Sequence, residues 1–177
     1  MRPDSLNFHQ IKKKYLKFLK SQEITSEPFR DKQGQLKNFY LPICKKINSE
    51  YVKRKKTKII GLSGGQGTGK STISQILKII LKEGFNLETV IFSIDDFYKT
   101  RKERKIMAKK ISPLFLTRGV PGTHDAKMLF NCIKNLKKNR FKKMTVPKFD
   151  KSKDDRSPKS KWLAVKKKPN IVIFEGW

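Results

Sequence analysis

The chain has 177 residues, of which 36% are hydrophobic and 33% charged, and its formal net charge is +28. This length suits one domain with a buried core, and the apolar content, which includes 12 Phe, argues against a disordered chain. The charge excess comes from 35 Lys against 8 Arg, whereas specific readers of nucleic acid use arginine and aromatic stacking, so we expect no specific nucleic acid partner.

The N-terminal part is predicted to be helical. Residues 5–20 carry apolar side chains at helical spacing, residues 21–38 are polar and turn-rich, and residues 41–56 form a second helical segment. A basic amphipathic helix can lie on a membrane, but packing on its own domain is the commoner outcome. We therefore predict that residues 1–56 form a helical extension packed on a core of residues 57–177.

A phosphate-binding loop follows a strand predicted at residues 57–62. The loop has the Walker A spacing G-x-x-x-x-G-K-S, and its glycines allow the backbone N–H groups to form a concave nest. The following helix is predicted to extend to about Lys82 with Gly84 as its C-cap, and it points its positive end at the same space. Lys70 can reach the terminal phosphates and Ser71 can ligate Mg²⁺. The cofactors expected are ATP and Mg²⁺, bound by Gly64, Gly65, Gln66, Gly67, Thr68, Gly69, Lys70, Ser71 and Thr72. A glycine-rich turn without a ligand is the alternative interpretation.

An acidic pair follows the second predicted strand, residues 88–94. Ligands of open parallel sheets bind beyond the carboxyl ends of the strands. Phosphoryl transfer also needs a carboxylate that accepts the proton of the attacking hydroxyl group. Asp95 is therefore predicted to be the catalytic base, acting with Lys70. Its neighbour Asp96 is either a second site residue or a helix cap.

The next part of the chain alternates helices with polar loops. Residues 99–111 are predicted to be helical, and residues 118–125 form a Gly/Pro-rich loop whose ionisable groups a plain turn does not explain. A helix over residues 126–138 and a short strand at residues 144–146 follow. Residues 148–168 are interpreted as a charged stretch without secondary structure, whose first part is either a solvated linker or a substrate-binding loop.

The last predicted strand, residues 170–174, is followed directly by Glu175. This is the position of a carboxylate near Mg²⁺, and an exposed charge at a strand end is the alternative. The alternation of strands and helices predicts an α/β fold with a parallel sheet and helices on both faces.

Six stretches of the sequence together resemble the D-glycerate 3-kinase family. They keep the order and approximate spacing of that family between Phe39 and Trp177. The stretch Arg-Gly-x-Pro-Gly-Thr-His-Asp and the stretch Phe-Asp-Lys-Ser indicate this family far more specifically than the phosphate loop, which many unrelated proteins share. More distantly the chain is similar to uridine kinase, phosphoribulokinase and bacterial pantothenate kinase. The six stretches are Ser63–Thr72, Ser93–Tyr98, Arg118–Asp125, Pro147–Ser152, Asp154–Arg156 and Phe174–Trp177.

The resemblance implies a P-loop NTPase three-layer sandwich that phosphorylates a hydroxyl group of a small hydroxy acid, most simply D-glycerate. It assigns Ser71 and Glu175 to the metal and Asp95 to proton abstraction. Lys148 stands where the family has arginine, a change that keeps the charge and loses the planar donor fork. The substrate-binding residues that it implies are Asp96, Tyr98, Arg118, His124, Asp125, Asp150, Lys151 and Arg156.

Members of this family continue well beyond the Glu-Gly-Trp strand. The related kinases have the strand order 2-3-1-4-5, so only the 2-3-1 part is expected here, with the phosphate-loop strand as an exposed edge. Two alternatives to a small-molecule kinase therefore stay open. One is a truncated nucleotide-binding half-domain without independent activity, which would need a complementing C-terminal segment or a homo-oligomer. The other is a nucleic-acid-associated P-loop ATPase, which the charge suggests.

The cysteines and the hydropathy predict a cytoplasmic protein. Cys44 and Cys132 lie far apart without metal-ligand spacing, which excludes a disulfide framework and indicates a reducing compartment. No apolar run approaches the length of about 18 residues that a membrane span needs.

Overall fold

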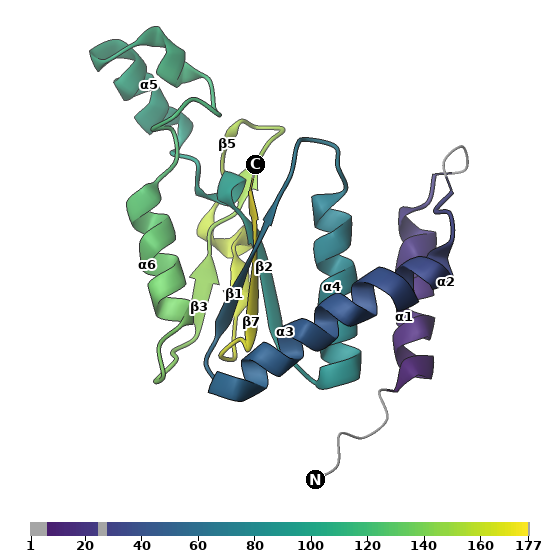
Figure 1. The fold of residues 1–177 in the computed structure, drawn as a ribbon. Coiled ribbons are helices and arrows are strands. Elements are labelled where there is room, and N and C mark those ends of the chain that lie inside the picture. Colours follow the sequence, from purple (N-terminus) through teal and green to yellow (C-terminus); the bar gives the residue numbers. More distant parts are fainter. Residues whose placement is uncertain (1–6, 25–27, 177) are drawn as a thin grey trace. The chain divides into compact units, whose positions relative to one another are not determined.

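The computed structural model describes residues 7–24 and 28–176, which fold into helices and short sheets (Figure 1). They divide into two compact units, unit 1 within residues 1–91 and 169–173, and unit 2 within residues 92–168 and 174–176. No helix in the described ranges is long and apolar enough to cross a membrane. The α-helices are α1 Phe8–Gln22, α2 Lys32–Gln35, α3 Leu41–Arg54, α4 Lys70–Phe85, α5 Arg101–Lys110 and α6 Ala126–Leu136. The strands are β1 Lys58–Ser63, β2 Thr89–Ser93, β3 Met144–Val146, β4 Phe149–Asp150, β5 Asp155–Arg156, β6 Leu163–Val165 and β7 Ile171–Gly176.

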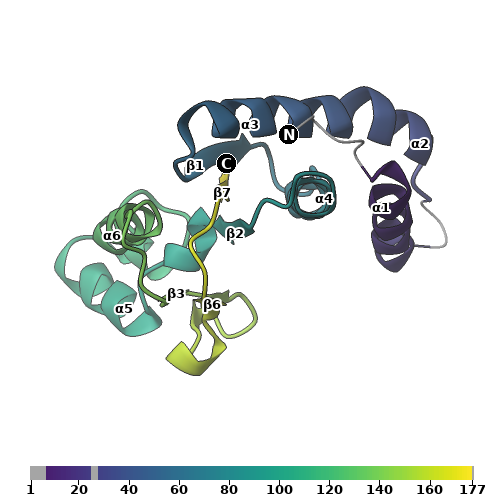
Figure 2. The same cartoon turned by 90° about the horizontal axis from the view of Figure 1, so that it is seen from below.

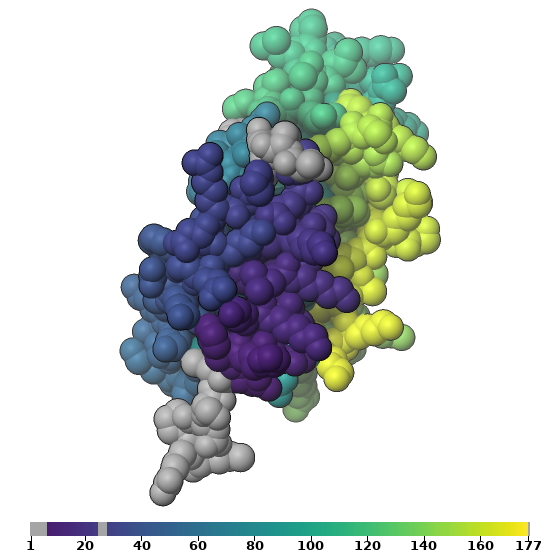
Figure 3. All heavy atoms as spheres, turned by 90° about the vertical axis from the view of Figure 1, so that its right-hand side faces the viewer, coloured from purple at the N-terminus to yellow at the C-terminus, as the bar shows by residue number. Residues whose placement is uncertain are grey.

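The first helix packs on α4 through one apolar stripe. Ile11, Tyr15 and Leu19 are four residues apart on α1, so they lie on one face, and all three are buried. Figure 2 shows α3 running across α1 and α4, and in Figure 3 the purple atoms of α1 lie beside the blue atoms of α3. The helix predicted over residues 5–20 is α1, although residues 5 and 6 lie outside the described residues. The division of the chain at residue 57 stays a prediction.

The second helical segment begins earlier than predicted. α2, one π-helical turn at Leu36–Tyr40 and α3 follow one another without a break, so the prediction of turns up to residue 38 is wrong. Pro42 accounts for the wide turn, because it has no N–H group and its ring crowds the preceding carbonyl groups. The Leu41 N–H group bonds to the carbonyl of Leu36, five residues back.

The central sheet has the strand order β1-β7-β2. The starts of the three strands lie together: the Lys58 N–H donates to the Asn170 carbonyl at 2.9 Å, and the Asn170 N–H donates to the Glu88 carbonyl at 2.8 Å. The strands therefore run in the same direction. Read from β2, this order is the 2-3-1 part of the predicted topology, and the predicted α/β fold with a parallel sheet is confirmed. The core of unit 1 includes Ile80 of α4 and Ile173 of β7, both fully buried.

The C-cap of helix α4 lies two residues later than predicted. Gly84 lies inside the helix, and Asn86 adopts the left-handed conformation at its end with φ of +51°. Asparagine is the residue that most often replaces glycine at this position. The Leu87 N–H group bonds back to the Leu81 carbonyl at 3.0 Å, and buried Leu87 closes the end of the helix.

Unit 2 contains secondary structure that the sequence did not indicate. β3 pairs antiparallel with β6, with Met144 opposite Val165, and β4 pairs antiparallel with β5. The prediction that residues 148–168 lack secondary structure is therefore wrong. Strands of two or three residues are too short to show an alternation of apolar and polar residues. Whether they form depends on the strand with which each one pairs.

Candidate functional site: a phosphate loop and a charged acceptor cluster

The phosphate loop, residues 64–71, connects β1 to α4 in unit 1. Gly67 and Gly69 have φ of +75° and +76°, a backbone conformation that side chains disfavour. At Gly64 an added Cβ would lie 3.1 Å from the hydroxyl oxygen of Thr68. The glycines at these positions therefore match what the backbone of the loop requires.

Helix α4 begins at this loop without a side-chain cap. Within the described residues, Gly69 at its N-cap provides no side-chain acceptor, whereas Asn7, Thr100 and Asp125 cap α1, α5 and α6. The first N–H groups of a helix need partners and lie at the positive end of its dipole. The start of α4 is therefore suited to an anion such as a phosphate.

Loop carbonyls hold the side chain of Lys70. Its ammonium group donates to the carbonyl of Gly64 at 2.6 Å and to that of Gly65, while the Thr68 hydroxyl donates to the Gly65 carbonyl at 2.9 Å. The other predicted ligands of the phosphates are consecutive in the chain. Gln66 and Ser71 are exposed, and Thr72 is half-buried in the first turn of α4.

Asp96 has a structural role in the turn that follows β2. Its carboxylate accepts the Ser93 N–H at 3.0 Å and the Phe149 N–H at 3.4 Å, and it pairs with Lys148 at 3.0 Å. Asp96 is almost fully buried. Ser93 is the N-cap of the 3-10 turn Ile94–Phe97, and Asp96 at its third position completes the capping box, a role close to the helix-cap alternative.

The carboxylate of Asp95 is only partly satisfied. Its Oδ2 lies 2.8 Å from the Lys151 ammonium nitrogen. Its Oδ1 is buried and has no hydrogen-bond partner among residues 7–24 and 28–176. Since buried carboxylate oxygens are normally bonded, Oδ1 is an acceptor that a hydroxyl group of a ligand could use.

The turn between β4 and β5 carries Lys151. Asp150 folds this turn, because its Oδ1 accepts the Ser152 N–H at 3.0 Å, the Ser152 hydroxyl at 2.6 Å and the Lys153 N–H at 3.3 Å. The hydrogen bond from the Ser152 hydroxyl lowers the pKa of Asp150 below its ordinary value. Asp150 thus shapes the turn, and the exposed Lys151 extends from it.

Two arginines hold the end of the same turn through Asp154. Asp154 is left-handed, with φ of +51°, and its carboxylate accepts from Arg118 at 2.7 Å and from Arg104 at 2.9 Å. Burial raises the pKa of Asp154, but the hydrogen bonds from Arg104 and Arg118 outweigh it and the pKa is lowered. Arg104 is fully buried and also donates to the carbonyls of Asp154 and Leu116, both at 2.6 Å.

His124 and Tyr98 form an aromatic wall of the cluster. Their rings stack with centroids 4.1 Å apart, and burial lowers the pKa of His124, an effect that the charge of Asp95 opposes. Arg156 donates to the Tyr98 carbonyl at 2.7 Å and lies 3.7 Å from the carboxylate of Asp125, which caps α6. All eight predicted acceptor residues lie in unit 2, and these contacts link Tyr98, His124, Asp125 and Arg156 to one another.

Arg104 is a residue of this cluster that the sequence pattern did not indicate. It lies in a helix of alternating charges, where an exposed side chain is the normal expectation. The one available signal was its type, since it is one of only 8 arginines among 43 basic residues.

Glu175 lies inside β7, because the strand extends to Gly176, and the expected position after the strand end is wrong. Its side chain is buried. Within the described residues no group of three or more His, Cys, Asp or Glu could hold a metal ion. A Mg²⁺ ion bound to nucleotide phosphates takes most of its ligands from phosphate and water, so one hydroxyl and one carboxylate from the protein suit it. The assignment of Ser71 and Glu175 to that ion stays a prediction.

Known proteins resemble the chain over most of its length. The family model of the phosphoribulokinase/uridine kinase family matches residues 59–177. "Uncharacterized kinase mug58" of Schizosaccharomyces pombe is 41% identical over 126 residues, which are 67% of this chain and 45% of that protein. "D-glycerate 3-kinase, chloroplastic" of Arabidopsis thaliana is 34% identical over 127 residues, 67% of this chain and 28% of that protein.

A solved structure of D-glycerate 3-kinase from Cryptococcus neoformans superposes with a TM-score of 0.68 at 28% sequence identity, covering 78% of this chain and 52% of that one. The chain thus spans about half of the solved protein and less of the two curated relatives. The family match includes the phosphate loop and every residue of the acceptor cluster. The chain belongs to the phosphoribulokinase/uridine kinase family.

Proposed function

We propose that the chain is the ATP-binding and acceptor-binding part of a kinase that phosphorylates a hydroxyl group of a small hydroxy acid, with D-glycerate as the first candidate. Family membership supports phosphoryl transfer, and two relatives are named D-glycerate 3-kinases. The observation that carries the proposal is the carboxylate of Asp95, whose buried Oδ1 lacks a partner in the described part of the chain while Oδ2 faces Lys151. An acceptor with a hydroxyl group and a nearby negative charge would complement this arrangement, because the hydroxyl could donate to Oδ1 and the negative charge could pair with Lys151.

On the nucleotide side, the phosphates would bind the N–H groups of the loop and the start of α4. Lys70 would exchange the carbonyls of Gly64 and Gly65 for phosphate oxygens, which is a short movement of a flexible side chain. Mg²⁺, when bound by Ser71 and Glu175, would supply positive charge to the β- and γ-phosphates.

On the acceptor side, the hydroxyl group would donate its hydrogen bond to Asp95 Oδ1. During transfer the hydroxyl proton moves to the carboxylate and the acceptor oxygen forms a bond to the γ-phosphorus. The bond from that phosphorus to the β–γ bridging oxygen breaks, and ADP leaves with the electron pair. The cationic side chains of Lys151 and Arg156 suit an acceptor that carries a carboxylate.

A coupled ADP-release assay with Mg-ATP and a panel of acceptors tests the proposal. The panel contains D-glycerate, L-glycerate, glycolate, lactate, pantothenate and glycerol, and we expect the highest kcat/KM with D-glycerate. The absence of turnover with every hydroxy acid, in a preparation that unfolds cooperatively, contradicts the proposal. ADP release that depends on DNA or RNA would instead identify a nucleic-acid-associated ATPase.

Thermal unfolding with and without Mg-ATP distinguishes a kinase from a half-domain without activity. A ligand that binds only the folded state raises the midpoint, by about 2.7 kcal/mol of stabilisation at 100 times its Kd. A raised midpoint without ADP release would identify a binding-competent half-domain, for which a complementing C-terminal segment or a second copy is the expected partner. A cytoplasmic location is part of the proposal, and the two cysteines are buried thiols whose pKa burial raises to about 12 for Cys44 and about 11 for Cys132.

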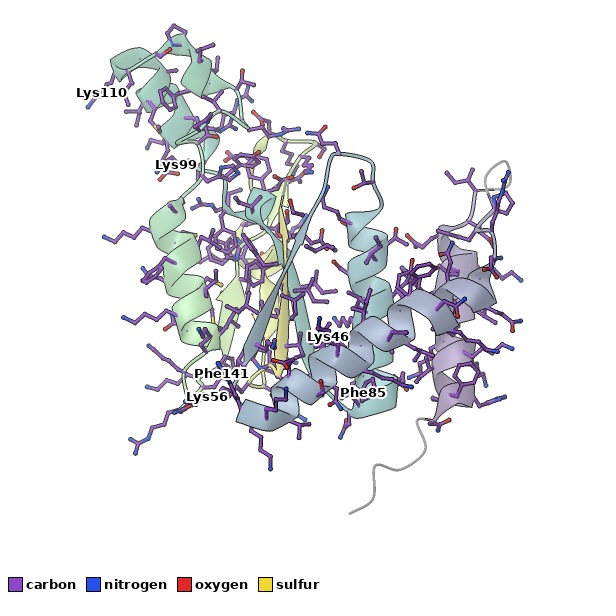
Figure 4. The ribbon with its side chains drawn as sticks, viewed as in Figure 1. Lys46, Lys56, Phe85, Lys99, Lys110 and Phe141 are labelled. Atoms are coloured by element: carbon purple, nitrogen blue, oxygen red, sulfur yellow. The ribbon has the colours of Figure 1, made fainter. Side chains whose placement is uncertain are left out.

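Most of the lysines belong to neither part of the proposed site. Figure 4 shows the side chains of Lys56 and Lys110 directed away from the ribbon, and both residues are exposed. Scattered exposed lysines of this kind favour weak, salt-dependent contacts with polyanions over a built nucleic-acid site.

A further inference from the structure

Lys151 pairs with one carboxylate oxygen of the proposed catalytic base and leaves the other without a partner. Its ammonium nitrogen lies 2.8 Å from Asp95 Oδ2, and the side chains of Lys151 and Asp95 are 65% and 23% exposed. Asp95 Oδ1 is buried without a hydrogen-bond partner in the described ranges. The ammonium group is therefore on the solvent side of the carboxylate, where a soluble acceptor arrives.

The fold fixes the backbone that presents Lys151. At one end of the turn Asp150 accepts three hydrogen bonds from Ser152 and Lys153. At the other end Asp154 is held by Arg104 and Arg118. Lys151 thus extends from a rigid turn, and its side chain can move while its Cα stays in place.

The neighbouring ion pair between Lys148 and Asp96 differs in kind. The Asp96 carboxylate also accepts the N–H groups of Ser93 and Phe149, so that pair belongs to the fold. The carboxylate of Asp95 differs, because its Oδ2 pairs with Lys151 and its Oδ1 has no hydrogen-bond partner within the described residues. The Lys151–Asp95 pair can therefore open without breaking a cap or a strand end.

We propose, on the basis of the proposed function, that Lys151 determines the selectivity for acceptors that carry a carboxylate. The Lys151 ammonium group leaves Asp95 Oδ2 and pairs with the acceptor carboxylate, so that one ion pair replaces another. This exchange draws the acceptor hydroxyl group, a few bonds away, toward Asp95 Oδ1 and frees the Asp95 carboxylate to take its proton. A neutral acceptor such as glycerol leaves the Lys151–Asp95 pair closed.

Kinetics of Lys151→Met and of the matched control Lys153→Met test this role. Lys153 is an exposed lysine two positions away in the same turn. We expect Lys151→Met to lower the ratio of kcat/KM for D-glycerate to kcat/KM for glycerol about 10- to 100-fold, the range for loss of one charge-assisted hydrogen bond. Lys153→Met should retain the selectivity of the unmodified protein. Equal selectivity in all three proteins would overturn the proposal.

Calorimetric titration without ATP separates this inference from the proposed kinase activity. D-Glycerate should bind to the unmodified protein and to Lys153→Met, and about 10- to 100-fold more weakly to Lys151→Met. If the unmodified protein releases no ADP with any acceptor but shows this pattern of binding, the kinase proposal fails and the role of Lys151 stands. Equal binding of D-glycerate to both variants overturns the role of Lys151 whatever the kinase assay shows. Thermal unfolding of each variant verifies that it is folded.

Discussion

The phosphate loop and the acceptor cluster of this protein are built in opposite ways. The loop, residues 64–71, is continuous in sequence and largely exposed, and most of its proposed phosphate contacts come from the backbone. The acceptor cluster gathers side chains from the turn after β2, the loop at residues 118–125 and the β4–β5 turn. Its members are linked by hydrogen bonds and ion pairs, and several are buried.

This difference determines how each region should respond to substitution. In the loop, each glycine and Lys70 acts through its own position, so single changes should alter nucleotide binding and little else. In the cluster, Arg104 and Asp154 fix the turn from which Lys151 extends, so a substitution at one residue should also change the position or contacts of another. The predictions below test this contrast, beginning with the largest expected effect.

Asp95→Asn should have the largest effect on turnover. An amide cannot accept the hydroxyl proton, so we expect kcat with the preferred acceptor to fall by about 10² to 10⁴. The phosphate loop lies in unit 1, away from this substitution in the sequence, so we expect nucleotide binding to be retained. A kinase assay together with the rise in Tm caused by Mg-ATP measures both quantities. Turnover close to that of the unmodified protein would remove Asp95 from the mechanism.

Lys70→Met should produce the reverse pattern. Loss of the ammonium group that neutralises the phosphates should lower kcat/KM for ATP by about 10² to 10³ and reduce the Mg-ATP effect on Tm. Binding of D-glycerate measured by calorimetry should remain. Lys78→Met, an exposed lysine farther along α4, is the control and should behave as the unmodified protein does.

Arg104→Met should weaken the fold of unit 2. The substitution leaves the carbonyl of Leu116 without its donor and Asp154 with only Arg118, and we expect a loss of about 3 kcal/mol in the free energy of unfolding. Urea unfolding measures this loss. Arg104→Lys keeps the charge but not the fork of donors, so it should recover only part of the stability. If Arg104→Met matches the stability of the unmodified protein, the hydrogen bonds of Arg104 to Leu116 and Asp154 do not hold the cluster together.

His124 should contribute the smallest effect, a dependence of stability on pH. Burial lowers its pKa in the folded state, so the unfolded chain takes up a proton first as the pH falls below about 6.5, the ordinary histidine value. The contribution of His124 is therefore complete above that pH and is lost as the pH decreases further. Urea unfolding of His124→Gln at several pH values should give a flatter profile, whereas His9→Gln, on an exposed position of α1, should not.

The contrast between the two regions also explains which parts could be predicted from sequence. The loop, the parallel sheet and the acidic residue Asp95 after β2 follow from spacing and from runs of apolar residues. The end of α4 was misplaced because Gly84 is a stronger C-cap signal than Asn86, and the packing of Leu87 decides between them. The strands β4, β5 and β6 were missed because strands of two or three residues in a charged stretch show no hydrophobic period and form only against a paired strand.

From local pattern alone, the phosphate loop and the alternation of strands and helices could be predicted, because both depend on residues close together in the chain; the strand order and the acceptor residues were expected only from the resemblance to a kinase family. Only the tertiary structure decided what those residues do. It shows that Asp96 completes a capping box, that Asp150 folds a turn, and that Lys151 pairs with Asp95 from 56 positions away. Such roles depend on which charged groups and N–H groups come into contact after folding, and these long-range contacts cannot be predicted from a local sequence pattern.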